Sequence, residues 1–189
     1  PIGVLLNSES GKLKIANYQD NTPQAVAGSI YVQNRLDPKS EESNPYKDIN
    51  VAEVKATGDV SIHSIGAIFN AVDPAVEADA IAIMAKNLEL AAMGDIGTAD
   101  KNLTTDINGG TLAAVSETGN IYIDNIGKSD IYLKNMAAPK GAISVKNDQN
   151  IYATDNYASE IPPYVQAGDT ITLISRKASV GALTKDGED

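Results

Sequence analysis

Residues 119–153 decide the fold, because one short pattern occurs in them four times. Each copy has one or two turn-forming residues, then an apolar residue, any residue and a second apolar residue. The copies are Gly119-Asn120-Ile121-Tyr122-Ile123, Ser129-Asp130-Ile131-Tyr132-Leu133, Gly141-Ala142-Ile143-Ser144-Val145 and Asn150-Ile151-Tyr152-Ala153. Alternating apolar positions are typical of a short β-strand with one buried face, and Gly, Asp and Asn suit the preceding turn.

The same pattern extends to both sides of this stretch. It recurs at residues 11–15, 28–32, 58–62, 79–83 and 168–173. Residues 73–93 also fit a helix that begins with Asp73 as N-cap and Pro74 at the first helical position. The alternation of apolar residues at 81 and 83 and at 88 and 90 favours strands there instead.

Equivalent apolar residues recur at a nearly constant spacing. Ile131, Ile151 and Ile171 lie 20 residues apart, as do Ile123 and Ile143, and Ile62 lies 21 residues before Ile83. A β-sandwich also has many short strands, but it does not require equivalent positions at a constant offset. The spacing therefore predicts an all-β fold, a parallel β-helix (solenoid) with coils of about 20 residues that stack and pair with one another.

Composition limits the other possibilities. The 189 residues carry a formal net charge of -10, which disfavours binding to nucleic acid and to anionic membranes. The chain has no Cys, so disulfides and thiolate chemistry are excluded. The sequence has no signal peptide or membrane-length apolar run, begins with Pro1 and ends in a polar stretch. We expect a single domain excised from a longer chain.

The pattern divides the chain into three parts. Residues 1–57 hold N-terminal strands and a polar stretch, residues 35–56, rich in Pro, Ser, Asn, Glu and Lys. Such composition buries little apolar area, so we expect an inserted loop that projects from one face. Residues 58–183 form the repeat region and residues 184–189 a polar tail. Whether residues 1–57 belong to the same solenoid stays open.

Residues 58–183 also resemble a known family. The phrase Gly94-Asp95-Ile96-Gly97, followed by Leu103-Thr104-Thr105-Asp106-Ile107 and Leu112-Ala113-Ala114-Val115, is similar to filamentous-haemagglutinin-like exoproteins, the large bacterial adhesins exported by two-partner secretion. The resemblance implies a right-handed β-helical shaft, a location outside the cell or on its surface, and a role in adhesion and virulence. The resemblance also implies an outer-membrane transporter as a partner during secretion. It implies no active site.

The inventory of reactive residues does not favour an enzyme. His63 is the only histidine, and the alternation around it predicts that it faces outward. Acidic residues precede several strands, at Asp59, Asp79, Asp95, Asp130 and Asp169. Their spacing is irregular, so we interpret them as turn-forming residues. We expect no cofactor and no dedicated metal site, although opportunistic calcium binding stays open.

Four tyrosines are the candidate partner-binding residues: Tyr31, Tyr122, Tyr132 and Tyr152. Each is flanked by an aliphatic residue that is expected to face inward, so its ring is expected to face outward, where it could stack on a sugar or anchor a protein. Tyr is also a good strand former, and this explanation stays open.

The leading hypothesis is a non-catalytic adhesive shaft segment that attaches to a glycan or protein of a host cell or of other bacteria. The alternative is a discrete glycan- or protein-binding module that uses the tyrosines or residues 35–56. A third possibility is a polysaccharide-degrading β-helix enzyme. A β-helix cut within its stack exposes unpaired strand edges, so we also expect covered ends or end-to-end self-association.

Overall fold

A computed structural model describes residues 11–19, 22–34, 47–73, 80–153 and 165–182. These residues form β-strands, and none of them lies in a helix. The strands are β1 (Lys12–Ile15), β2 (Asn17–Gln19), β3 (Thr22–Gln24), β4 (Ile30–Gln33), β5 (Ile49–Lys55), β6 (Val60–Ser64), β7 (Ile68–Asn70), β8 (Ile83–Ala85), β9 (Leu88–Ala92), β10 (Leu103–Ile107), β11 (Thr111–Ser116), β12 (Ile121–Asn125), β13 (Ile131–Ala138), β14 (Ile143–Asn147), β15 (Ile151–Ala153), β16 (Val165–Ala167), β17 (Ile171–Ser175) and β18 (Val180–Ala182).

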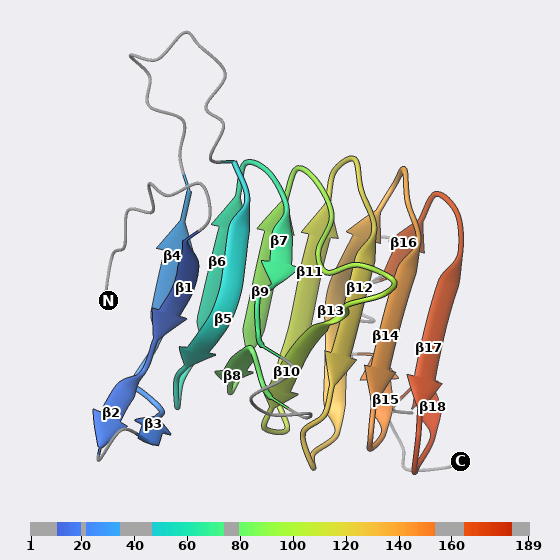
Figure 1. Ribbon diagram of the computed structural model, residues 1–189. Coiled ribbons are helices and arrows are strands. Elements are labelled where there is room, and N and C mark those ends of the chain that lie inside the picture. Colours follow the sequence, from blue (N-terminus) through green and yellow to red (C-terminus); the bar gives the residue numbers. More distant parts are fainter. Residues whose placement is uncertain (1–10, 20–21, 35–46, 74–79, 154–164, 183–189) are drawn as a thin grey trace, which may run out of the picture.

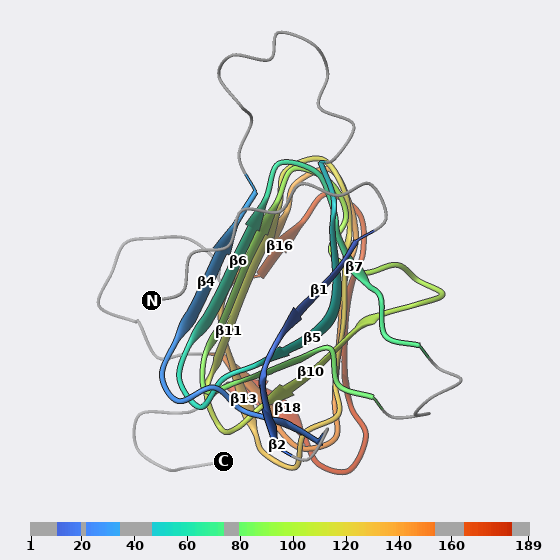
Figure 2. The same cartoon turned by 60° about the vertical axis from the view of Figure 1, so that its left-hand side comes forward.

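Nearly all strands belong to two sheets that face each other across one core (Figures 1 and 2). The first sheet has the order β1-β5-β8-β10-β12-β14-β17, with β7 paired to β5. The second has the order β18-β15-β13-β11-β9-β6-β4, with β16 paired to β13. The pairs within both sheets are parallel, and β2 and β3 form a separate antiparallel pair. The arrangement is all-β and consistent with the predicted β-helix.

We call the chain between one strand and its neighbour in the same sheet a coil. The central coils are short: Leu103 pairs with Ile123, Ile121 with Ile143, and Ile131 with Ile151. Other coils are longer, for example the one between Ile143 and Ile171, which contains residues 154–164. The predicted period of about 20 residues therefore holds for the central coils only.

Three of the predicted registers are wrong. Ile171 pairs with Ile143 in the first sheet, whereas Ile151 pairs with Val180 in the second. Ile123 pairs with Val145 rather than with Ile143. Ile62 lies in β6 of the second sheet and Ile83 in β8 of the first. Strands of both sheets have the same apolar alternation, so the sequence pattern does not distinguish them.

Two predicted boundaries also need correction. The loop predicted at 35–56 overlaps β5, in which Ile49, Val51 and Val54 are fully buried, so the polar stretch ends before the strand; residues 35–46 lie outside the described residues. Strand β8 begins at Ile83, and Ala82 is buried beside it while Ile81 is half-buried, so the predicted alternation of 81 with 83 fails. The tail at 184–189 also lies outside the described part.

Strands on both sides of residue 58 belong to the same sheets. In the second sheet β4 pairs with β6, with Ile30 beside Val60, and in the first sheet β5 pairs with β8, with Val54 beside Ile83. Strands β1, β4 and β5, which precede residue 58, thus belong to the same stack, whereas β2 and β3 do not.

The core is a set of aliphatic columns, since equivalent positions of successive strands lie on top of one another. One column in the first sheet consists of Leu103, Ile123 and Val145, and one in the second of Leu88 and Leu112; all five are buried. Small and medium aliphatic side chains fill the space between the two sheets. Aromatic residues make up only 5% of the sequence, which suits a core of this kind.

A polar column runs through this core along three neighbouring strands of the first sheet, at or near their carboxyl ends. Thr105, Asn125 and Asn147 are fully buried and occupy equivalent positions of β10, β12 and β14. Thr105 Oγ1 donates to Asn125 Oδ1 over 2.9 Å, and Asn125 Nδ2 donates to Asn147 Oδ1 over 2.8 Å. Buried polar groups are costly unless paired, so these amides fix the register of neighbouring coils.

Candidate functional site

The outer side of the second sheet carries a row of outward-facing polar and aromatic side chains in register. In β4, β6 and β9 the inward residues are buried and the residues between them are half-buried or exposed, so alternate side chains point away from the core. Tyr31 pairs with Ser61, Ser61 with Glu89, and Glu89 with Ala113. This row crosses four neighbouring strands.

The row ends at an irregularity in β13. Between β11 and β13 the register shifts, so that Leu112 pairs with Leu133 while Ala113 pairs with Asn135. The extra residue leaves Lys134 and Asn135 both exposed, although they are consecutive. A β-bulge has this effect, because two residues of one strand oppose one residue of its neighbour. Two polar side chains therefore emerge side by side at the end of the row.

A shallow depression lies along this row. Its volume is about 420 Å³, and its lining includes Tyr31, Ser61, Glu89, Ala113, Lys134 and Asn135. Ala113 is small, whereas Tyr31 and Lys134 at the two ends are large, which explains the hollow between them. We call this depression, together with Tyr132 and Tyr152 on the same sheet, the tyrosine face.

The two tyrosines are stacked on each other. Tyr132 pairs with Tyr152 across β13 and β15, their ring centroids lie 5.5 Å apart and their planes differ by 29°. Tyr31, which is 50% exposed, lies four strands away from β13, on the order of 19 Å at the usual strand spacing. The structure thus places three of the four tyrosines that were predicted to bind a partner on one sheet.

Tyr122 does not join them. It lies in β12 of the first sheet, where it pairs with Ser144, so the four tyrosines do not form a single face. The Ile-Tyr-x triplet gives no indication of the sheet to which its strand belongs. All four tyrosines keep the predicted outward orientation, since each follows a buried isoleucine and is itself half-buried or exposed.

His63 forms part of the same surface, as predicted from the strand alternation. Its Nε2 lies 3.2 Å from Ser61 Oγ and 3.3 Å from Glu89 Oε1. A serine nucleophile needs the acid and the hydroxyl on opposite nitrogens of the imidazole ring, whereas both contacts here involve Nε2. The arrangement therefore binds side chains together and differs from a catalytic triad. The pairing of Ser61 with Glu89, 28 residues later in the sequence, could not be recognised before the register was known.

The acidic residues in the turns bind the following coil. Asp95 Oδ1 accepts hydrogen bonds from the backbone and side chain of Asn120, over 2.7 and 3.0 Å. Asp130 accepts the same pair from Asn150, and Asp59 accepts one from Asn87. These three residues lie between a bend and the next extended residue, as predicted for turn residues, and Asp169 lies in the bend before β17; Asp79 lies outside the described residues. Within the described ranges, no group of three or more His, Asp or Glu side chains could hold a metal ion.

The outer side of the first sheet carries a second depression of about 310 Å³, lined by Lys101, Asp124 and Lys146 among others. Several of its polar groups are already engaged. Lys101 Nζ donates to Val72 O over 2.8 Å, and Asp124 Oδ2 accepts a hydrogen bond from Arg176. Asp124 Oδ1 is buried and has no hydrogen-bond partner among the described residues. This depression is a weaker candidate than the tyrosine face, because fewer of its groups are available.

Arg176 connects three coils of the first sheet. It donates to Asp148 over 2.9 Å as well as to Asp124, and Lys177 binds the other oxygen of Asp148. Hydrogen bonds from Lys177 and then from Arg176 hold the pKa of the Asp148 carboxyl below its ordinary value. Sequence reasoning missed this cluster because Arg176 and Asp124 are 52 residues apart.

Comparison of the chain with protein families, with curated proteins and with solved structures finds no match. In the part of the chain that the structure describes, no helix has the length and apolar character needed to cross a membrane.

Proposed function

We propose that the chain is a non-catalytic, adhesive segment of a large secreted bacterial surface protein, and that it attaches to a cell-surface glycan through the tyrosine face. In this proposal the stacked strands form a right-handed parallel β-helix, the hand that dominates crossover connections between parallel strands. The resemblance to filamentous-haemagglutinin-like exoproteins supports the secretion route through an outer-membrane transporter and the extracellular location.

One observation carries the choice of a glycan: an elongated polar depression runs across the strands and shares its sheet with a stacked pair of aromatic rings. The apolar face of a sugar ring stacks on an aromatic ring, and its hydroxyl groups bind carboxylate, amide and ammonium groups. Glu89, Asn135 and Lys134 offer these three groups along the depression. The length of the row suits an extended chain of several sugars better than a single small molecule.

Replacing Tyr132 and Tyr152 by serine should weaken glycan binding by roughly fivefold to 150-fold, because each of the two lost aromatic contacts is worth about 0.5–1.5 kcal/mol. A glycan array identifies a ligand, and titration calorimetry then compares the variant with the unchanged chain. The matched control is Tyr122→Ser, which removes a tyrosine from the same kind of triplet on the other sheet. It should leave the affinity unchanged.

Two results would contradict the proposal: no binding to any glycan of a broad panel, or equal losses in the variant and its control. Thermal unfolding of both variants shows that they remain folded. Measuring soluble sugar products in the same samples separates adhesion from polysaccharide degradation, since an adhesive segment releases none.

A further inference from the structure

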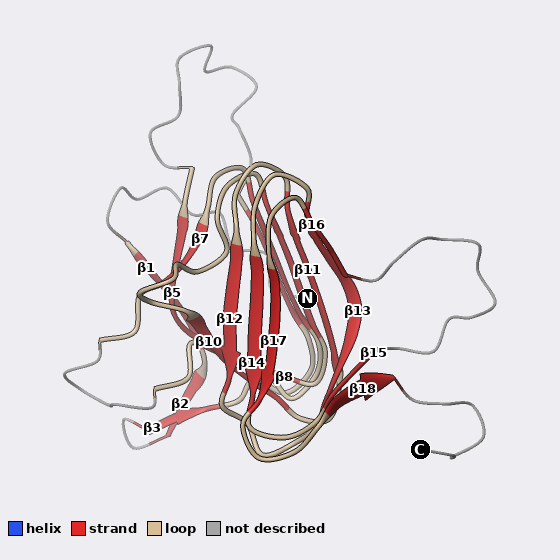
Figure 3. Ribbon diagram, turned by 90° about the vertical axis from the view of Figure 1, so that its right-hand side faces the viewer, coloured by secondary structure: helices blue, strands red, loops and turns tan. Residues whose placement is uncertain are grey.

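The turns that lead from the first sheet to the second are stacked on one another, coloured tan in Figure 3, and three of them meet around Asn108. Asn108 lies between β10 and β11, Lys86 between β8 and β9, and Ser129 between β12 and β13. The Asn108 backbone N–H donates to Ala85 O over 3.1 Å, which holds it against the preceding turn. The Asn108 side chain is exposed and lines an open depression of about 580 Å³, so water reaches it.

Asn108 is followed by Gly109, whereas every other asparagine in the sequence is followed by a residue with a side chain. The backbone nitrogen of the residue after an asparagine is held close to its Cγ and attacks it to close a five-membered succinimide ring, an intramolecular reaction. A side chain on that next residue hinders the attack, and glycine has none. Gly109 also has a φ of 65°, a left-handed conformation that other residues rarely adopt.

Ser129 and Lys86 bind the two groups whose charges change in this reaction. Ser129 Oγ donates to Asn108 Oδ1 over 3.1 Å, so it stabilises the negative charge that develops on this oxygen when Cγ is attacked. Lys86 Nζ donates to Asn108 O over 3.0 Å and to Gly109 O over 3.2 Å. Because Asn108 O and Gly109 N belong to one peptide group, the ammonium lowers the free energy needed to remove the proton from this nitrogen.

We propose that Asn108 is a self-modification site, at which the chain converts this asparagine into aspartate and isoaspartate. The hydrogen bond from Gly109 N to Ile107 O, 3.0 Å long, opens first. Gly109 N then bonds to Asn108 Cγ, the Cγ–Nδ2 bond breaks, and Nδ2 leaves as ammonia with the proton of Gly109 N–H. Water, the one co-reactant, opens the succinimide. Its addition to Cγ gives aspartate, and its addition to the backbone carbonyl carbon of residue 108 gives isoaspartate.

The isoaspartate product lengthens the backbone by one carbon atom immediately before Gly109 and Gly110. Gly110 is buried and packs so closely against the preceding turn that a Cβ atom there would overlap Lys86 O. The extra atom should therefore separate these two turns, and the fraction that carries isoaspartate should unfold at a lower urea concentration than the unmodified chain.

This inference is independent of glycan binding. The purified chain is kept at mildly alkaline pH, and peptide mass spectrometry follows the replacement of the Asn108 amino group by a hydroxyl group. Lys86→Met should slow this conversion by at least about fivefold, the effect of one hydrogen bond that strengthens in the transition state. Ser129→Ala should slow it as well. Lys86→Arg keeps a charged donor and should react at nearly the unchanged rate.

The matched control is Lys128→Met, which removes the same charge from the same depression and should leave the rate unchanged. Asn135, which is exposed but followed by Met136, should stay asparagine in the same digest. Circular dichroism confirms that the variants keep their strands. An unmodified Asn108 under conditions that convert a synthetic peptide of residues 104–112 would overturn the proposal. Equal rates in the unchanged chain and the Lys86→Met variant, or equal slowing by Lys128→Met, would overturn it too.

Discussion

Replacement of Asn125 by alanine is expected to lower the free energy of unfolding by roughly 3 to 5 kcal/mol. The Asn125 side chain is fully buried and forms three hydrogen bonds within the core. Its Oδ1 accepts from Thr105 Oγ1 and from the backbone N–H of Ile107, and its Nδ2 donates to Asn147. Alanine leaves these groups buried without partners and adds a cavity. Since small domains are stable by only about 5–15 kcal/mol, the loss is a large share of the total.

Urea unfolding followed by circular dichroism measures this effect. The matched control is Asn135→Ala, which removes an exposed amide from the β13 bulge and should change stability by less than about 0.5 kcal/mol. If the Asn125 variant were as stable as this control, the buried polar column would have no part in holding the coils in register.

Replacement of Gly110 by alanine is also expected to have a large effect. It should lower the free energy of unfolding by about 3 kcal/mol. A Cβ atom at Gly110 would lie 1.6 Å from the carbonyl oxygen of Lys86 in the preceding coil, and backbone cannot move aside as a flexible side chain can. The two coils would have to separate locally, which would disturb the hydrogen bond from Tyr132 N to Gly110 O.

The comparison variant is Gly181→Ala, since a Cβ at Gly181 meets no atom within 4 Å. It should leave the urea midpoint almost unchanged or raise it slightly, because alanine restricts the unfolded chain. Equal midpoints for the two variants would mean that the coils do not approach each other at Gly110.

The strands themselves could be predicted, because each combines a turn residue with local alternation, and both signals lie within a few residues. β12, β13 and β14 all lie where this pattern places them. Register could not be predicted in the same way. The pairing of Ile143 with Ile171 depends on the length of the whole intervening coil, and no local signal shows that this coil is longer than its neighbours.

The candidate site was predictable only in part for the same reason. The outward orientation of Tyr31 and His63 follows from strand alternation, which the sequence shows directly. The tyrosine face depends on which strands are neighbours: Tyr132 joins Tyr152, and Tyr122 lies on the other sheet, although the three triplets look alike. The bulge that exposes Lys134 and Asn135 depends on pairing with β11 and has no separate sequence signal.

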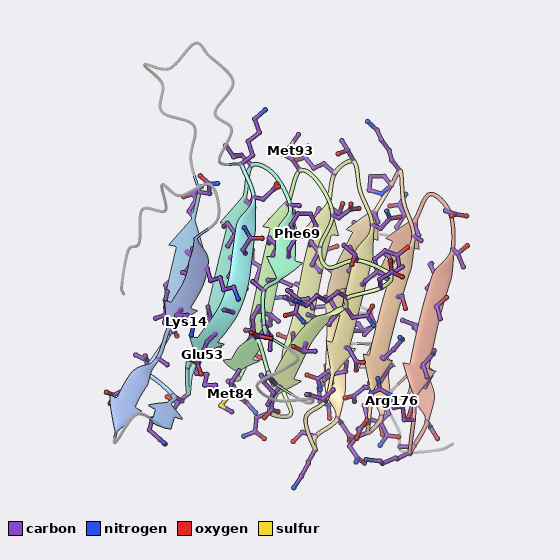
Figure 4. All side chains as sticks on the ribbon, in the orientation of Figure 1. Lys14, Glu53, Phe69, Met84, Met93 and Arg176 are labelled. Carbon is purple, nitrogen blue, oxygen red and sulfur yellow. The ribbon has the colours of Figure 1, made fainter. Side chains whose placement is uncertain are left out.

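Parallel strands stack in one order along the first sheet, and distances between spin labels test this order most directly. In Figure 4, Lys14 marks the β1 end of this sheet, and Arg176 the β17 end. From a label at Lys14, a second label at Lys146 in β14 lies five strands away and one at Ile174 in β17 lies six strands away. With strands about 4.8 Å apart, the structure predicts separations of about 24 and 29 Å, in that order. A label at Ile174 closer to Lys14 than the label at Lys146 would contradict the stacked arrangement.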